Sequence, residues 1–216
     1  MTTSTELIIL HTTRYGENSV VIHTLSRDYG RRSFLVRSAG RNVMFLLLPL
    51  NILEADVTES TKSTLFTARN LTSRHPLLGI RNNIYKNTMT MFLSEVIYRT
   101  IKEGTAEEGL FEWCRKQILL LSSMESDFSN FHIRFLLELS IALGFSPETS
   151  DLMPFVGGNH EVVSHLMTCS FAESMLVPLS GPVRNKICED VLRYIEYHTE
   201  STLTINSLKV LRELFV

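Results

Sequence analysis

The spacing of apolar residues changes near residue 75, and this change limits the folds open to the chain. Before that point, short apolar or β-branched runs are separated by turn residues. After it, apolar residues recur every three or four positions. The first pattern is typical of strands and the second of amphipathic helices. The sequence therefore predicts an α+β chain, with a β domain at 1–75 followed by an all-helical domain at 76–216.

The first part contains enough strand segments for a small barrel. The candidate strands are 6–10, 19–25, 32–38, 43–58 (one bent strand or two) and 63–72. Within the fourth segment, the apolar run VMFLLLPL at 43–50 is interpreted as a buried strand. Several short strands separated by Gly, Asn and Asp favour a five-stranded barrel of the oligonucleotide-binding (OB) type over a seven-stranded sandwich.

The second part contains five segments with helical spacing. These are 85–96, 111–121, 131–143, 187–195 and 205–215. Between the third and fourth, residues 145–181 contain SPETSD, GGNH and SGP, which are typical of loops. We interpret 145–181 as an irregular excursion, with a short hairpin near 162–177.

Composition and cysteine usage exclude several classes of protein. With 44% apolar and 20% charged residues among 216, the chain has the composition of an ordinary folded protein. The run at 43–50 is far shorter than the ~20 residues that a membrane helix needs. Three widely spaced cysteines, Cys114, Cys169 and Cys188, do not make a disulfide framework. The start of the chain lacks the pattern of a secretory signal, so we expect a cytoplasmic protein.

Positive charge is concentrated in one short stretch. SRDYGRRSFLVRSAGR, at 26–41, holds five arginines and one acid, although the whole chain has a net charge of −2. Residues 1–75 carry nine Lys or Arg against six Asp or Glu, whereas 76–216 carry twelve against seventeen. This asymmetry indicates a first domain that faces a polyanion and a second domain with another task.

The stretch supplies the candidate DNA-binding residues. They are Arg27, Arg31, Arg32, Arg37, Arg41 and Tyr29. In a small barrel, arginines from two turns and the strand between them can share one surface, where guanidinium groups grip phosphate oxygens. Tyr29 is a candidate for base stacking, whereas Phe34 fits a core position better. The alternative is that these arginines are solvated and protect exposed strands from aggregation.

The sequence gives no support for catalysis. It contains no nucleophile elbow, no phosphate-binding loop and no dinucleotide fingerprint. His160, His165 and Cys169 lack the paired spacing of a structural zinc site, so we expect no metal. We therefore expect a protein that is not an enzyme.

Taken together, residues 15–41 resemble the N-terminal signature of the RecO family of bacterial recombination mediators. The matching features are Tyr15, Glu17 and Ser19, then an apolar strand, TLSRDYG, and a second strand that ends in a small residue and GR. Weaker similarity continues in LPLNILEADV, in the helical segments and in FHIRFLLELSIALGFSPE. The closing NSLKVLRELF resembles the Bacteroides-like branch.

The resemblance implies a fold, a function and partners. RecO proteins have an N-terminal OB barrel and a helical C-terminal domain. They bind single- and double-stranded DNA, anneal complementary strands and help to load RecA onto strands covered by single-strand binding protein (SSB), usually with RecR. The family's basic barrel surface corresponds to the arginine stretch, and the family works at the nucleoid.

Two departures from the family pattern affect this expectation. Many members carry a four-cysteine zinc site, but this chain has no C-x-x-C, so we predict no zinc. The basic loop after AGR is short here, which shifts more of the binding onto a partner or the second domain.

The second domain is expected to bind proteins. Arg134 is a candidate for the basic rim of a pocket that holds the acidic SSB tail, and a solvated or internally paired arginine is the alternative. A second hypothesis is a protein–protein adaptor with weak or no DNA binding. A third, an enzyme that uses 145–181 as a lid, has the least support.

Overall fold

The computed structural model describes residues 2–37, 41–60, 65–145 and 148–215; for 41, 42 and 149 it describes the backbone only. Internal contacts divide the chain into two compact units. One contains Met1–Leu78 and Leu93–Ile118, and the other contains Gly79–Phe92 and Leu119–Val216. We call them the barrel unit and the helical unit. The domain boundary after residue 75 stays a prediction.

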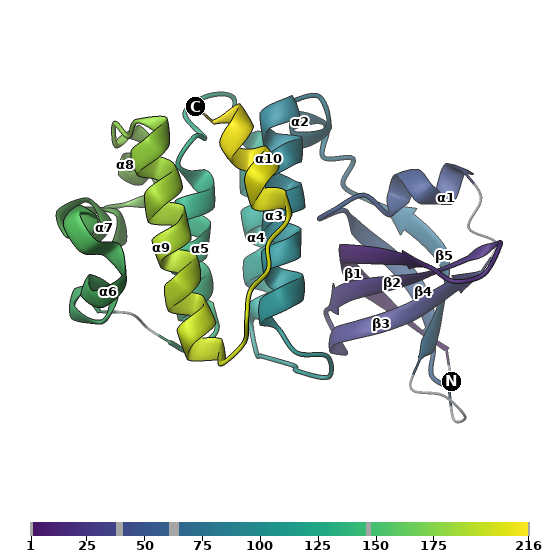
Figure 1. Ribbon diagram of the computed structural model, residues 1–216. Coiled ribbons are helices and arrows are strands. Elements are labelled where there is room, and N and C mark those ends of the chain that lie inside the picture. The colour runs from purple at the N-terminus through teal and green to yellow at the C-terminus, as the bar shows by residue number, and fades with distance from the viewer. Residues whose placement is uncertain (1, 38–40, 61–64, 146–147, 216) are drawn as a thin grey trace. The chain divides into compact units, whose positions relative to one another are not determined.

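In the described part of the barrel unit, five strands close a mixed barrel (Figure 1). They are β1 (Thr2–Arg14), β2 (Ser19–Ser26), β3 (Gly30–Arg37), β4 (Ile52–Thr58) and β5 (Phe66–Ser73). The order around the barrel is β1-β2-β3-β5-β4, and β4 pairs back to β1. Neighbours are antiparallel except β3 and β5, which are parallel. The predicted class, α+β with an N-terminal OB-type barrel and a helical C-terminal part, is confirmed.

Alternation along each strand fills the barrel with one apolar face. The buried core residues of the strands are Leu7, Ile9, Val20, Ile22, Phe34, Val36, Leu53, Ala55, Val57, Phe66 and Ala68. Successive side chains of a strand point to opposite faces, so these core residues are every second residue of their strands. Burial of each large side chain stabilises the fold by about 1.5–3 kcal/mol.

The interpretation of 43–50 as a buried strand is wrong. The segment forms the helix α1 (Arg41–Leu46) and a turn, between β3 and β4. Val43, Leu46 and Leu47 pack against the barrel core. Their spacing of three and four residues is helical, but the surrounding apolar residues hide it in the sequence. Asn51 fixes the helix end, because its Nδ2 donates to the carbonyl oxygens of Phe45 and Leu46.

Helical residues also belong to the barrel unit. They are the C-terminal half of α3 (Ile84–Thr100) and the first part of α4 (Leu110–Ser123). The loop between these helices bonds to the start of β3: the Arg31 amide donates to the Thr105 carbonyl, and the Gly104 amide donates to the Arg31 carbonyl, both at 2.8 Å.

The helical unit is built around α5 (Phe131–Ala142) and α9 (Gly181–Thr199), which lie side by side. The other helices are α2 (Leu78–Arg81), α6 (Thr149–Val156), α7 (His160–Thr168), α8 (Phe171–Leu176), α10 (Ser207–Leu214) and the 3-10 turn η1 (Gly157–Asn159). Each of the five predicted helical segments corresponds to a helix, although α10 begins only at Ser207. Within the described residues, none of these helices has both the length and the apolarity to cross a membrane.

The interpretation of 145–181 as an irregular excursion with a hairpin is wrong for the described residues. The segment contains α6, η1, α7 and α8. Capping boxes begin two of these short helices: Glu148 with Asp151, and Ser170 with Glu173. Each pair satisfies backbone donors that a helix start leaves free. Among the described residues of the loop-like motifs, Gly157 ends α6 and Ser180 precedes α9, so they mark the ends of helices.

Candidate nucleic-acid interface

Among the predicted arginines whose side chains the structure describes, no single exposed surface is formed. Arg27 is ion-paired, Arg31 and Arg32 lie against aromatic rings, and Arg37 is exposed. Arg31 and Arg37 are six positions apart on β3, which is about 20 Å along a strand. The side chain of Arg41 lies outside the described residues, although its backbone begins α1.

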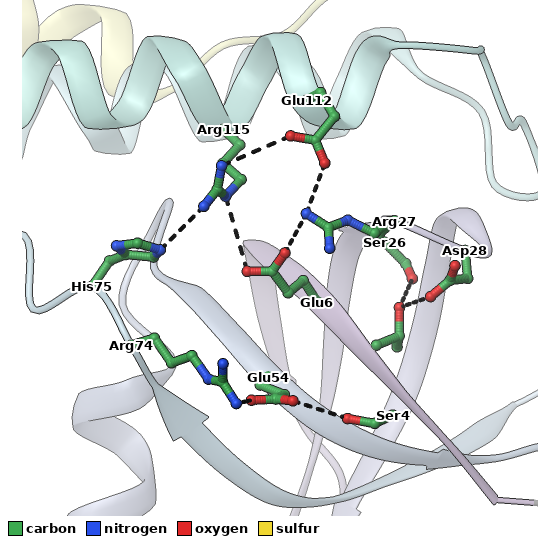
Figure 2. Close-up of polar contacts among 11 residues, drawn as sticks. Ser4, Glu6, Ser26, Arg27, Asp28, Glu54, Arg74, His75, Glu112 and Arg115 are labelled. Atoms are coloured by element: carbon green, nitrogen blue, oxygen red, sulfur yellow. Dashed lines mark hydrogen bonds and ion pairs between the residues drawn. The ribbon is translucent and has the colours of Figure 1, made fainter.

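Arg27 belongs to a network of ion pairs (Figure 2). Its Nη2 lies 2.5 Å from a carboxylate oxygen of Glu6 and 2.7 Å from one of Glu112. Arg115 lies 3.9 Å from Glu6 and 3.8 Å from Glu112. Two arginines therefore alternate with two glutamates, and the charge of Arg27 is balanced within the barrel unit. Its side chain is still 43% exposed.

Arg31 is buried on the outer face of β3. Only 4% of the residue is exposed, and its guanidinium lies 4.7 Å from the ring centre of Tyr98. The rings of His11 and His23 contact the same tyrosine. Burial lowers the pKa of Arg31, and Glu103 opposes this shift. The arrangement fastens α3 to the strands, because a cation against an aromatic face is attracted by the ring quadrupole.

Arg32 and Tyr29 lie at the edge of the barrel core. The guanidinium of Arg32 is 4.2 Å from the ring centre of Phe66. The ring of Tyr29 makes edge contacts with Phe34 and Phe66 at 6.2 and 5.7 Å between centroids. Both side chains therefore pack on the apolar residues that close the barrel. Tyr29 is partly buried there, which leaves less of its ring for a base.

Arg37 lines a groove where β3 and β5 separate. The two strands pair only at Phe34 with Phe66 and at Leu35 with Thr67. Two residues further along each strand stand Arg37 and Arg69. The cavity of about 600 Å³ is lined by Val36, Arg37, Val43, Ala68, Arg69, Asn70 and Leu71. The groove therefore has an apolar floor and two exposed guanidinium groups.

Arg14 lies at the same end of the barrel. The register pairs Arg14 with Val20, and Val20 with Val36, the neighbour of Arg37. We call Arg14, Arg37 and Arg69 the cationic end. All three are exposed, and among the described residues none of them has an ion-pair partner. Arginine stays charged in proteins, so these groups attract anions at any working pH.

The surroundings of the cationic end include an aromatic ring and two acids. Tyr15, in the turn after β1, is 59% exposed. Asp56 lies opposite Arg69 in the β4–β5 ladder and accepts a 2.7 Å hydrogen bond from Asn70. Glu17 is exposed in the β1–β2 turn. In OB barrels this turn commonly contacts oligonucleotides. The arrangement suits a phosphate backbone with a base stacked on Tyr15.

Arg134 lies on α5 and lines a cavity in the helical unit. Its Nε donates to Glu138 at 2.8 Å, and its Nη1 donates to the carbonyl oxygens of Leu166 and Cys169. Only 16% of the side chain is exposed. The guanidinium is thus used to join α5 to the end of α7. The role of Arg134 in partner binding stays a prediction.

Sequence reasoning missed Arg14 and Arg69. Both are isolated cations, and neither lies in the 26–41 stretch. The sequence shows only that each of them comes after strand-like residues. The strand pairing that places them at the same end as Arg37 is decided by the tertiary structure. For metals, the described residues contain no group of three or more His, Cys, Asp or Glu arranged to hold an ion. The expected lack of zinc stays a prediction.

Residues 1–76 match the family described as "Recombination protein O N terminal", and residues 81–153 match "Recombination protein O C terminal". The chain belongs to the RecO family. The predicted resemblance is therefore confirmed. RecO proteins are non-enzymatic DNA repair and recombination proteins, which also confirms that the chain is not an enzyme.

Relatives named "DNA repair protein RecO" match most of the chain. The protein of Phocaeicola vulgatus is 28% identical, over 96% of this chain and 97% of the relative. The protein of Bacteroides fragilis is 27% identical over the same shares. That of Flavobacterium johnsoniae is 30% identical over 70% of this chain and 66% of the relative. The similarity to the Bacteroides-like branch of RecO is thus confirmed.

Proposed function

We propose that this RecO protein is a recombination mediator in the bacterial cytoplasm, at the nucleoid. It binds single- and double-stranded DNA, anneals complementary strands and helps to load RecA onto SSB-coated single strands, with RecR and the SSB tail as partners. The observation that supports DNA binding is the groove between Arg37 and Arg69, with Arg14 at the same end. Membership of the RecO family supports the later steps.

The physical basis of binding is phosphate contact. Each guanidinium that neutralises a phosphate releases a condensed counterion, which favours binding without regard to sequence. A strand held in this way keeps its bases outward, and partial neutralisation lowers the repulsion of a second strand. Annealing follows from these two effects. The other predicted DNA-binding residues, Arg27, Arg31, Arg32, Arg41 and Tyr29, stay predictions of lower rank than Arg37.

A protein–protein adaptor is the second candidate. It is favoured because Arg27 is neutralised by Glu6 and Glu112 and Arg31 is buried, which leaves fewer cations for DNA than the sequence indicates. The net charge of −2 points the same way.

A salt titration of binding to a fluorescent single strand separates the two functions. Three engaged arginines predict that log K falls against log salt with a slope of about −2, at about −0.7 per phosphate neutralised. Replacing both Arg37 and Arg69 with alanine should move this slope to about −0.7. The affinity at low salt should fall similarly for unrelated sequences, because the backbone is what is bound.

Arg74→Ala is the matched control. Arg74 is also exposed on the barrel, but it is paired with Glu54 at 2.6 Å (Figure 2). Its loss should leave the slope unchanged. A slope near zero for the unmodified protein would favour the adaptor. If Arg74→Ala changed the slope as much as the double substitution of Arg37 and Arg69, the cationic end would not be the binding site.

A further inference from the structure

A cavity in the helical unit combines apolar walls with more acid than base. It has a volume of about 510 Å³ and is lined by Arg134, Leu137, Glu138, Ile141, Glu148, Ser150, Met167 and Thr168. These residues come from α5, the start of α6 and the end of α7. This volume lies in the range of about 300–1,000 Å³ that is usual for ligand sites.

The apolar part of the cavity is a stripe along α5. Leu137 is buried at its floor, whereas Ile141, one turn further, is 55% exposed. Residues four apart lie on the same side of a helix, so the two side chains form a continuous apolar surface. Met167 extends it from α7. An apolar side chain of a partner would cover Ile141.

The one arginine of the lining has little charge left for a ligand. Arg134 is neutralised by Glu138 at 2.8 Å, and its Nη1 donates to the Leu166 and Cys169 carbonyl oxygens at the C-terminal end of α7. Carbonyl oxygens at a helix end carry partial negative charge, which the guanidinium offsets. An incoming carboxylate would have to displace these partners.

Glu148 adds a negative charge at the other side of the cavity. It is exposed, and it pairs with Asp151 in the capping box that begins α6. Among the described residues, no ion pair to a Lys or Arg neutralises Glu148. The lining thus holds two carboxylates against one guanidinium that is already engaged, so the cavity favours a cation.

We propose that this cavity binds a segment of a partner protein in which an apolar side chain stands next to Lys or Arg. The apolar residue covers Ile141 and Leu137, and the cation lies against Glu148. This site is separate from the DNA-binding surface and does not depend on it. An acidic tail would instead bring carboxylates against Glu148 and Glu138, so the predicted role of Arg134 toward the SSB tail requires another geometry.

Two matched fluorescent peptides test the proposal by polarisation with the full chain. Both contain leucine and phenylalanine; lysines flank the pair in one peptide and aspartates in the other. The lysine peptide should bind about five- to tenfold more tightly at low salt, since each exposed charge contact contributes about 0.2–1 kcal/mol and the aspartates are also repelled. The difference should shrink as salt is added.

Three variants assign the effect to the cavity. Ile141→Ser should weaken the lysine peptide at least about fivefold, and Glu148→Gln should reduce the preference for lysine over aspartate. Leu176→Ser is the control, because Leu176 is 67% exposed on α8 outside the cavity. This variant should bind both peptides with unchanged affinity. Thermal unfolding by circular dichroism checks that each variant is folded.

The remaining outcomes overturn the proposal. Equal affinity for both peptides removes the role of the carboxylates, and a preference for aspartate supports an acidic tail at Arg134 instead. If the lysine peptide fails to bind at millimolar concentration, the segment described here is excluded. An Ile141→Ser variant that is folded and binds the lysine peptide unchanged excludes the cavity as its site.

Discussion

At the scale of single residues, the face and the position along a strand decide what an arginine does. Arg31 and Arg37 occupy the same outer face of β3, but the first is covered by Tyr98 and the second is exposed. A buried guanidinium contributes to stability through its contacts, whereas an exposed one is available to a ligand. The same residue type therefore has two roles within one strand.

Replacing Arg31 with alanine should affect stability and leave DNA binding largely intact. The substitution removes a cation–π contact and opens a cavity, so the free energy of unfolding should fall by about 1–3 kcal/mol. Arg37→Ala, in which an exposed side chain is lost, should change it by less than about 0.5 kcal/mol. Urea unfolding measures the free energy of unfolding of both variants, and the salt slope measures their DNA binding. The opposite pattern would mean that Arg31 contacts DNA.

His132 should make the helical unit sensitive to acid. It is fully buried beside Phe92 and Phe215, and burial, aided by Arg184, lowers its pKa to about 3. The unfolded chain binds a proton near pH 6.5, whereas the folded chain does not until about pH 3. The free energy of unfolding should therefore fall by about 1.4 kcal/mol for each pH unit below 6.5.

His132→Phe isolates this effect, because phenylalanine fills a similar space between the two rings. Denaturant unfolding between pH 7 and 4 should show a dependence on pH reduced by about 1.4 kcal/mol per unit. His11 and His23 have lowered pKa values as well, chiefly through burial, and act in the same direction. If the variant and the parent lose stability in parallel, His132 is not the buried neutral group.

At the scale of elements, a short helix packs on the barrel strands, and one glycine lets a loop approach β3. α1 and the residue after it pack on the barrel through Val43, Leu46 and Leu47, and the loop after α3 bonds to β3 beside Gly30. Gly30 has φ of +60°, and a Cβ there would lie 2.2 Å from the carbonyl oxygen of Thr105. The helical part of the barrel unit can approach β3 because no side chain stands at this position.

Gly30→Ala should therefore lower the free energy of unfolding by more than an ordinary glycine substitution does. Strain at positive φ and the clash together should lower the free energy of unfolding by about 2–5 kcal/mol. Gly16→Ala is the matched control: Gly16 has φ of +70°, but open space surrounds it. It should cost only about 1–2 kcal/mol. Urea unfolding of the two variants compares the costs, and equal values would show that the loop yields to the added methyl group.

At the scale of the whole molecule, the excess positive charge of residues 1–75 is distributed differently from what the sequence predicts. Among its described side chains, the arginine-rich stretch stabilises the barrel at one end and exposes Arg37 at the other. Arg14 and Arg69 lie outside that stretch, on β1 and β5. Of the three arginines at the cationic end, only Arg37 could thus be predicted from the sequence, because the register between strands decides which cations lie together.

The amino-acid sequence alone determined that a β part comes first and a helical part follows, because the period of apolar residues follows directly from the geometry of each backbone. It also carried the similarity to RecO. Only the tertiary structure decided that 43–50 turns into α1, that 145–181 is helical, and that Arg31 is buried while Arg69 lies beside Arg37. These outcomes depend on which surfaces meet after the barrel closes, and contacts between distant segments leave no periodic trace in the chain.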